Sequence, residues 1–334
     1  STTAIDNLDD LNGTGNAYTI TVGTAQVNAS ALNTVNAATT VDVNATAVTQ
    51  ITGSAAELAI TFNGSGITGL GNETIVLTDT SLAAATLTPT VNNYSTSTVN
   101  ATSVTELTGT NAEIVAAYTA DTATTVNLDG DVKLTVSDNV TFTEANTLNG
   151  HTSGVVTASI STTAIDDLDN LDDTGNAYTI TVGTAQVTAA ALNTVNAATT
   201  VNVTATAVTK ITGTAADLAT TYGGGITGLG DEAVIVSNNI THTQANTVDA
   251  YTTGVVTATL STTAIDDLDG LTGTGNAYTI TVADSQVNAA ALNTVNAATT
   301  VDVTATAVTQ ITGSLSDLAT TYTVNNGLTG LGDE

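Results

Sequence analysis

The chain has almost no basic residues and no cysteine. It contains 31 acidic residues but only two basic ones, Lys133 and Lys210, which gives a formal net charge of −29. This charge repels phosphates, and no basic patch can be assembled, so nucleic acids and anionic membrane surfaces are excluded as direct partners. Without cysteine, neither a disulfide framework nor a thiolate metal site can form. A calcium-rich medium is compatible, because divalent cations screen and bridge carboxylates.

Other absences restrict which residues can form the core and whether the chain can enter a membrane. There is no methionine or tryptophan and only 3% aromatic residues, so Val, Ile, Leu and Ala must form the core. No apolar run approaches the ~18 residues of a membrane helix, and we expect no membrane insertion. Disorder is a poor interpretation, because 41% of the residues are hydrophobic and they are regularly spaced. The sequence begins at Ser1 without a visible signal peptide, and we expect it to be a segment of a longer protein.

Internal repetition dominates the sequence. The phrases STTAID, GNAYTITV and ALNTVNAATTV each occur three times, and residues 161–212 differ from residues 261–312 at nine positions. The single proline, Pro89, and the lack of a linker-like stretch favour one continuous body over residues 1–334. We predict that this body consists of three superrepeats: 1–160 with a 60-residue insertion, 161–260, and a truncated 261–334.

Each superrepeat divides into rungs of 22–32 residues that carry one helix signal and one strand signal. The helix signal is a capping box or its Asp variant, in which a hydroxyl residue precedes an acid or amide by three positions. It occurs at Ser54, Thr110, Thr141, Thr163, Thr214, Thr241 and Ser314. The strand signal is alternation of apolar and polar residues, with three predicted inward-facing sets: Tyr178, Ile180 and Val182; Val201, Val203 and Ala205; Val256, Ala258 and Leu260.

One strand and one helix in every ~25 residues predict a repeat solenoid, because a single rung cannot bury its own apolar face. We expect a parallel β-sheet with short helices or turns on the other side of each rung. About thirteen rungs at roughly 4.8 Å spacing would give a rod of about 60 Å. An all-β solenoid is the alternative, because Thr and Val favour strands and two-turn helices are easily overridden. Open ends would expose strand edges, which favours end-to-end stacking or a longer chain.

The phrases VTQITGSAAELAITF, GITGLGNETIVLTD, VTELTGTNAEIVAAYT and LNTVNAATTVDV are the basis of a resemblance. They resemble the Thr/Ala/Asn-rich tandem repeats of giant cell-surface proteins of marine bacteria, cyanobacteria in particular. The resemblance covers essentially the whole chain and implies an extracellular, non-enzymatic role in adhesion, surface layers, motility or filament formation. Such proteins often accompany calcium-binding nonapeptide repeats, but the G-G-x-G-x-D pattern of those repeats is missing here.

Acidic clusters are the only candidate ligand sites. The largest contains Asp166, Asp167, Asp169, Asp172 and Asp173, and smaller ones contain Asp6, Asp9 and Asp10, and Asp266, Asp267 and Asp269. Hard carboxylate oxygens suit calcium, but the same residues fit the solvated face of a short helix. No EF-hand spacing is present.

No catalytic constellation is visible in the sequence. The two histidines, His151 and His242, have no second His or Cys nearby, so neither zinc binding nor general-base catalysis is indicated. We therefore expect no enzyme and no obligatory cofactor, with calcium binding possible.

Two kinds of extracellular function remain open from the sequence. The first is a structural segment of a bacterial surface protein: a rigid rod, surface layer or filament that associates with itself end to end or laterally. The alternative is an adhesin or binding module whose Thr/Asn/Asp faces meet carbohydrate, ice or calcium. The Thr-x-Thr pairs that prompt the ice hypothesis are Thr19 with Thr21, Thr179 with Thr181, Thr257 with Thr259, and Thr279 with Thr281.

Overall fold

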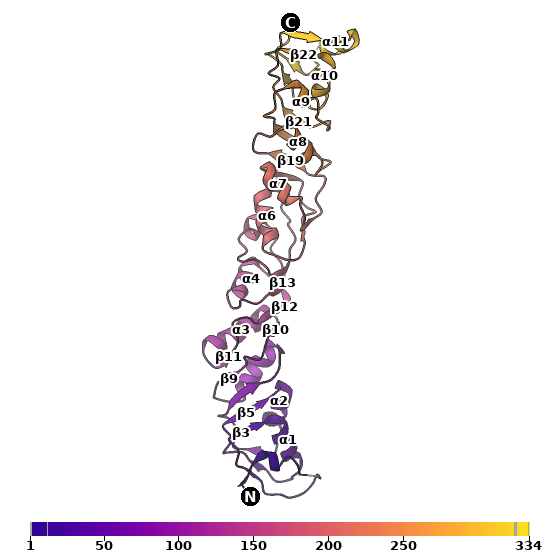
Figure 1. Ribbon diagram of the computed structural model, residues 1–334. Coiled ribbons are helices and arrows are strands. Elements are labelled where there is room, and N and C mark those ends of the chain that lie inside the picture. Colours follow the sequence, from indigo (N-terminus) through magenta and orange to yellow (C-terminus); the bar gives the residue numbers. More distant parts are fainter. Residues whose placement is uncertain (1, 12, 324–325, 333) are drawn as a thin grey trace. The chain divides into compact units, whose positions relative to one another are not determined.

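The computed structural model (Figure 1) describes residues 2–11, 13–323, 326–332 and 334, without the side chains of Thr2, Thr3 and Asp6. The chain divides into two compact units. The first holds Ser1–Ser161 with Gly175–Tyr178, and the second holds Thr162–Thr174 with Thr179–Glu334. Each unit is built from short strands and short helices in a repeated order, and each is described by itself.

The described residues of the first unit form three parallel sheets. The first has the strand order β1 (Thr2–Thr3), β2 (Thr21–Val22), β4 (Val43–Asn44) and β6 (Ile67–Thr68). The second has the order β11 (Val126–Asn127), β9 (Val99–Asn100), β7 (Thr74–Leu77), β5 (Gln50–Gly53) and β3 (Gln26–Asn28). The third has the order β14 (Ala177–Thr179), β13 (Val156–Ile160), β12 (Lys133–Val140), β10 (Glu106–Gly109) and β8 (Ser81–Ala83).

Short helices connect these strands. The α-helices of the first unit are α1 (Ala29–Ala37), α2 (Ala55–Asn63), α3 (Asn111–Thr122) and α4 (Phe142–Asn149). Two 3₁₀ turns and a π-helical turn complete it: η1 (Ile5–Asn7), η3 (Val91–Asn93) and η2 (Thr86–Thr90). The peptide bond between Thr88 and Pro89 in η2 is cis.

The second unit repeats this construction. Its largest sheet, in which β21 is an edge strand, has the order β15 (Gln186–Thr188), β17 (Lys210–Gly213), β19 (Ala233–Val236), β20 (Val256–Thr259) and β21 (Ala277–Thr279). Three strand pairs accompany it: β16 (Val203–Thr204) with β18 (Ile226–Thr227), β22 (Gln286–Asn288) with β24 (Gln310–Thr312), and β23 (Val303–Thr304) with β25 (Leu328–Thr329).

The helices of the second unit follow one another in chain order (Figure 1). They are α5 (Ile165–Leu168), α6 (Ala189–Ala197), α7 (Ala215–Thr221), α8 (His242–Asp249), α9 (Ile265–Leu268), α10 (Ala289–Ala297) and α11 (Leu315–Thr321). The protein is therefore α/β, with parallel sheets and short helices in a repeated pattern. The all-β alternative is wrong, because the capped segments form hydrogen-bonded helices rather than turns.

The core is a set of in-register apolar rows. In the second unit Val187 pairs with Ile211, Ile211 with Val234, and Val234 with Val256. The last three of these side chains are completely buried. Parallel pairing places equivalent residues side by side, so a residue that faces inward in one rung adds to the same row in the next. This stacking compensates for the small apolar face of each rung.

The cap signals predict most of the helix starts correctly. Ser54, Thr110, Thr141, Thr214, Thr241 and Ser314 are N-caps, and each side chain accepts a hydrogen bond from the backbone N–H three residues on. The prediction for Thr163 is wrong. Helix α5 starts after Ala164, whose side chain cannot cap, and the first N–H of the helix, on Ile165, instead donates to Thr184 Oγ1 at 3.0 Å. The cap comes from the next rung.

The strand predictions hold with one exception. The sets around Ile180 and Ala258 are buried as expected, and so are Val203 and Ala205. Val201 was predicted to share their inward face, but its side chain is 39% exposed. The strand begins only at Val203, because the chain is still bending away from α6 at Val201.

Candidate functional site

The largest acidic cluster lies on and after the one-turn helix α5. Asp166 and Asp167 belong to its first turn, Asp169 is its C-cap residue, and Asp172 and Asp173 follow in the loop. Asp173 has a left-handed backbone with φ +67°, and its carboxylate accepts the backbone N–H of Thr174 at 2.7 Å. Within the part of the chain that the structure describes, no three His, Cys, Asp or Glu side chains are grouped to share a metal ion. Calcium binding here stays a prediction.

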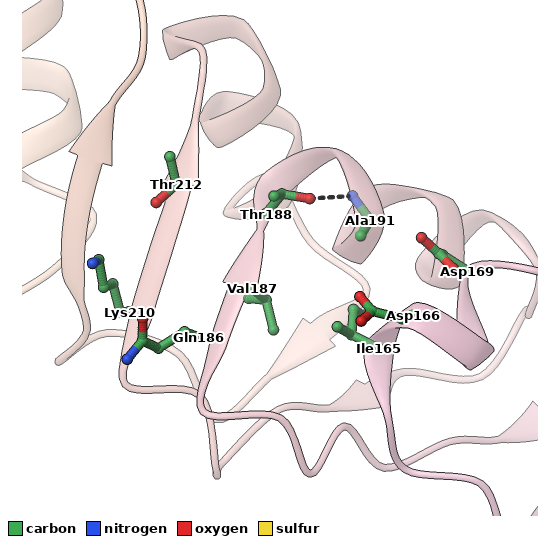
Figure 2. Close-up of a pocket in the computed structure, with 9 residues that line it drawn as sticks. All are labelled: Ile165, Asp166, Asp169, Gln186, Val187, Thr188, Ala191, Lys210 and Thr212. Carbon is green, nitrogen blue, oxygen red and sulfur yellow. Dashed lines mark hydrogen bonds between the residues drawn. The ribbon is translucent and has the colours of Figure 1, made fainter.

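Asp166 and Asp169 line a groove of about 290 Å³ in the second unit (Figure 2). Its other walls come from strands β15 and β17, where Gln186 pairs with Lys210 and Thr188 with Thr212. Thr188 also caps α6, accepting the N–H of Ala191 at 3.2 Å. The one-turn helix α5 thus forms one side of the groove, and the strands β15 and β17 form the other.

An equivalent groove occurs in the first unit, with a volume of about 240 Å³. It is lined by Ile5, Gln26, Val27, Asn28, Gln50 and Thr52, which correspond in the repeat to Ile165, Gln186, Val187, Thr188, Lys210 and Thr212. The site therefore follows from the repeat and is not peculiar to one rung. Both copies of the groove offer amides, hydroxyls and aliphatic groups. In the second unit Lys210 replaces Gln50, and Asp166 and Asp169 add carboxylates.

The two histidines occupy packing positions. The ring of His151 stacks on Tyr118, with ring centres 4.8 Å apart. His242 lies at the start of α8, and its Nε2 is 3.1 Å from Thr243 Oγ1. Neither ring has a hydrogen bond to a carboxylate among the described contacts, so the pair of Thr243 and His242 lacks there the third group that orients the base of a catalytic triad. The prediction that the chain is not an enzyme remains a prediction.

Threonine rows on the outer faces are interrupted. Thr212 pairs with Ile235, and Thr257 pairs with Ala277, although Thr259 pairs with Thr279. Elsewhere threonine hydroxyls are used internally, since Thr227 Oγ1 donates to the Val203 carbonyl at 3.2 Å. A regular outward lattice of hydroxyls is therefore not formed by these strands.

Polar contacts between consecutive rungs are the feature that sequence reasoning missed. Before four of the strands, a threonine donates both its N–H and its hydroxyl to one carbonyl of the preceding rung, with Oγ1–O distances of 3.0–3.1 Å. These residues are Thr49, Thr105, Thr209 and Thr309. The signal was present as a threonine at the same place in each rung. Its role could not be assigned without the neighbouring rung.

A second inter-rung contact joins helices. Asn193 on α6 donates from Nδ2 to the Asp217 carbonyl on α7 at 2.9 Å and accepts the hydroxyl of Thr221 at 2.9 Å. Thr221 is only 1% exposed, and its buried hydroxyl is satisfied by the half-buried Asn193. The same clamp recurs as Asn33 with Thr61 and as Asn293 with Thr321.

Two glutamates are fully buried in the Gly-Leu-Gly-x-Glu loops. Glu232 accepts the N–H of Gly230 at 2.7 Å and the hydroxyl of Tyr222 at 2.8 Å. Burial, then the hydrogen bond and charge of Glu232, raise the pKa of Tyr222 far above its ordinary value. Glu73 accepts the N–H of Gly71 at 2.8 Å, but its Oε1 has no partner among the described residues.

Carboxylates also stabilise helix starts. Glu57 accepts the N–H of Ser54 at 2.8 Å and its hydroxyl at 2.9 Å, and these two bonds lower the pKa of Glu57. Glu144 makes the same pair of bonds with Thr141 and its pKa is lowered in the same way. Both carboxylates are ionised at neutral pH and stabilise the first turn of their helices.

Comparison with known proteins gives no family assignment: no family model, curated protein or solved structure matches this chain. Among the described residues, no helix is long and apolar enough to cross a bilayer. The site must therefore be interpreted from its own geometry.

Proposed function

We propose that this chain is a non-enzymatic structural segment of an extracellular bacterial surface protein, folded as a solenoid over its whole length. Its function would be mechanical, as a rigid rod, surface layer or filament that assembles by rung stacking. The observation that carries the proposal is that the recurring polar chemistry joins one rung to the next. Threonine-to-carbonyl bonds, asparagine–threonine clamps and caps donated across rungs all recur, whereas no reactive group does.

Rung-to-rung bonding supports a mechanical role for a physical reason. In a solenoid each rung contacts only its neighbours, so stiffness depends on the interface between consecutive rungs. Here that interface combines in-register apolar rows with half-buried, satisfied hydrogen bonds. A net charge of −29 opposes non-specific collapse and would make lateral association sensitive to divalent cations.

Electron microscopy and small-angle scattering of the chain, with and without calcium, test this function. A single stiff particle, or ordered filaments built from it, is the expected result. Two bodies that tumble independently, with no assembly at any calcium concentration, would contradict both the continuous solenoid and the mechanical role.

A binding module is the second candidate, favoured by the recurrence of the groove in both units. Its amide, hydroxyl and carboxylate lining suits polyhydroxylated ligands such as carbohydrates, or calcium. A glycan array probed with the wild-type chain and with Gln186→Ala tests this candidate. Binding that is lost in the variant would support it, and an array without signal would exclude glycans.

A further inference from the structure

A polar pocket of about 360 Å³ lies between two loops of the second unit. One loop follows helix α8 and contributes residues 252–255, the other follows α9 and contributes residues 274–276, and Asp249 at the end of α8 completes the lining. Volumes of about 300–1,000 Å³ are typical of small-molecule sites. The pocket shares no lining residue with the groove beside α5.

Side-chain amides hold the walls of this pocket in place. Asn246 on α8 donates from Nδ2 to the Gly270 carbonyl at 2.8 Å and accepts the N–H of Thr272 at 3.0 Å, which fixes the second loop against the helix. Asn276 is 2% exposed, and its Nδ2 donates to Asp249 Oδ1 at 2.7 Å while its Oδ1 accepts a backbone N–H of β20 at 2.9 Å. The carboxylate of Asp249 is therefore oriented before any ligand arrives.

The negative charge of Asp249 is not needed for this contact. At the equivalent place in the first unit, Asn149 Oδ1 accepts the Nδ2 of Asn176 at 3.0 Å, so a neutral amide oxygen makes the same hydrogen bond. The second carboxylate oxygen of Asp249, Oδ2, has no hydrogen-bond partner among the described residues. An added Cβ at Gly273 would lie 2.4 Å from it. An unused charged acceptor therefore lies beside this loop.

The loop beside this acceptor differs from its copy in the preceding superrepeat. Residues 170–173 have the sequence NLDD, whereas residues 270–273 have the sequence GLTG. Three of the nine differences between residues 161–212 and 261–312 thus fall in four positions, and they remove two carboxylates and an amide. A divalent cation would be held better by additional carboxylates, so their loss beside Asp249 favours a neutral ligand.

The rest of the lining suits a hydroxylated ligand. Thr274 is exposed, and its hydroxyl makes no hydrogen bond among the described residues. At Gly275 no atom lies within 4 Å of an added Cβ, so its backbone borders open space. The side chain of Val255 is 49% exposed and offers an aliphatic surface to the C–H face of a sugar ring. The net charge of −29 repels anionic sugars.

We propose that this pocket binds a neutral sugar unit of a polysaccharide. Hydroxyl groups of the sugar donate to Asp249 Oδ2 and form hydrogen bonds with Thr274 Oγ1, and hydrogen bonds to an ionised acceptor are stronger than those between neutral groups. No aromatic ring is among the described residues that line the pocket, so we expect weak binding, with a Kd of about 1 mM. The inference goes beyond the mechanical role and does not depend on it.

Saturation-transfer NMR of the 334-residue chain with the methyl glycosides of glucose, galactose and mannose tests the pocket. At least one glycoside should bind, and Asp249→Asn should weaken that binding about tenfold. The variant should keep the wild-type melting curve in circular dichroism, because Asn149 makes the same contact in the first unit. Thr274→Val removes an exposed hydroxyl and should weaken binding about threefold.

Gln186→Ala is the matched control, because it changes the groove beside α5 and leaves this pocket intact. Binding that is lost in Gln186→Ala, or that survives unchanged in both Asp249→Asn and Thr274→Val, would place the sugar elsewhere and overturn the proposal. No saturation transfer to any of the glycosides at about 50 mM would reject the pocket.

A calcium chloride titration separates the remaining alternative. Shifts of the Thr274 and Gly275 amide signals with calcium, and none with a glycoside, would make a cation the ligand and overturn the proposal. None of these results changes the stiffness of the particle in scattering, so the mechanical role stands or falls separately.

Discussion

Two rungs have nearly the same sequence but differ in the hydrogen-bond partners of one buried glutamate. They are residues 54–73 in the first unit and 214–232 in the second. Both end in a Gly-Leu-Gly-x-Glu loop, and both bury the glutamate completely. In the second unit Tyr222 donates its hydroxyl to Glu232. In the first unit the same place is held by Phe62, which stacks on Tyr94 but has no hydroxyl to donate. Glu73 is left with one buried oxygen without a partner among the described residues.

The comparison separates the features of a rung that apolar packing alone produces from those that need one particular polar side chain. Helix α2 has nine residues and α7 has seven, but both bury a leucine and a threonine, Leu58 with Thr61 and Leu218 with Thr221, and both rungs keep the ring stack. These shared features do not depend on the tyrosine hydroxyl. What differs is the satisfaction of one buried carboxylate, and a buried polar group without a partner costs about 1–3 kcal/mol. The first rung carries this cost and the second does not.

The largest effect should come from the glycine that both rungs share. Gly69 and Gly228 have φ +88° and +82°, and an added Cβ would lie 2.4 Å from Thr46 or Thr206 Cγ2. We expect Gly228→Ala and Gly69→Ala each to destabilise their rung by about 3 kcal/mol, from backbone strain plus overlap. Native-state hydrogen exchange of the rung measures this.

Gly275→Ala is the matched control for these glycines. Its φ is +81°, but no atom lies within 4 Å of the added Cβ. The substitution should therefore cost only the backbone strain, about 1 kcal/mol. Equal losses at Gly228 and Gly275 would show that the close approach to threonine is unimportant.

Tyr222→Phe should convert the second rung into the state of the first. The stack on Tyr251 is retained, but Glu232 loses a donor in a fully buried site. We expect a loss of about 2 kcal/mol in the local opening free energy. Denaturant unfolding and hydrogen exchange over residues 214–236 measure it. An unchanged rung would mean that Glu232 gains no stability from the hydroxyl.

Phe62→Tyr is the reciprocal change and should be stabilising. The added hydroxyl can donate to the unpartnered Oε1 of Glu73, and the expected gain is about 1 kcal/mol. The gain should disappear in a Glu73→Ala background. A gain that persists there would come from the ring and not from the new hydrogen bond.

The smallest effect is the pH dependence of the cap in the first rung. Hydrogen bonds from Ser54 lower the pKa of Glu57 below its ordinary value of 4.5. A depressed folded-state pKa gives stability that is present above about pH 4.5 and is lost as the pH falls through the lower folded value. Protection factors of α2 amides between pH 6 and 3 should follow this course. Glu57→Gln should flatten it, and an identical profile in the variant would exclude Glu57 as the cause.

Much of the local structure could be predicted from the sequence. Ser54, Thr110 and Thr214 identified their helices, since a capping residue acts on N–H groups two or three positions away. The apolar alternation around Ile180 identified a buried strand face, because successive side chains of a strand point to opposite sides of the sheet. This signal is local too. The error at Thr163 arose because its helix is capped from another rung by Thr184.

Repetition, alternation and capping by themselves determined a repeat protein with one strand signal and one helix signal in each rung, and they left an all-β solenoid open. Only the tertiary structure decided the contacts between rungs. Asn193 with Thr221 and Asn238 with Ala215 join residues 28 and 23 positions apart in the sequence. Their pairing depends on how one rung is seated on the next, and no local pattern specifies that register.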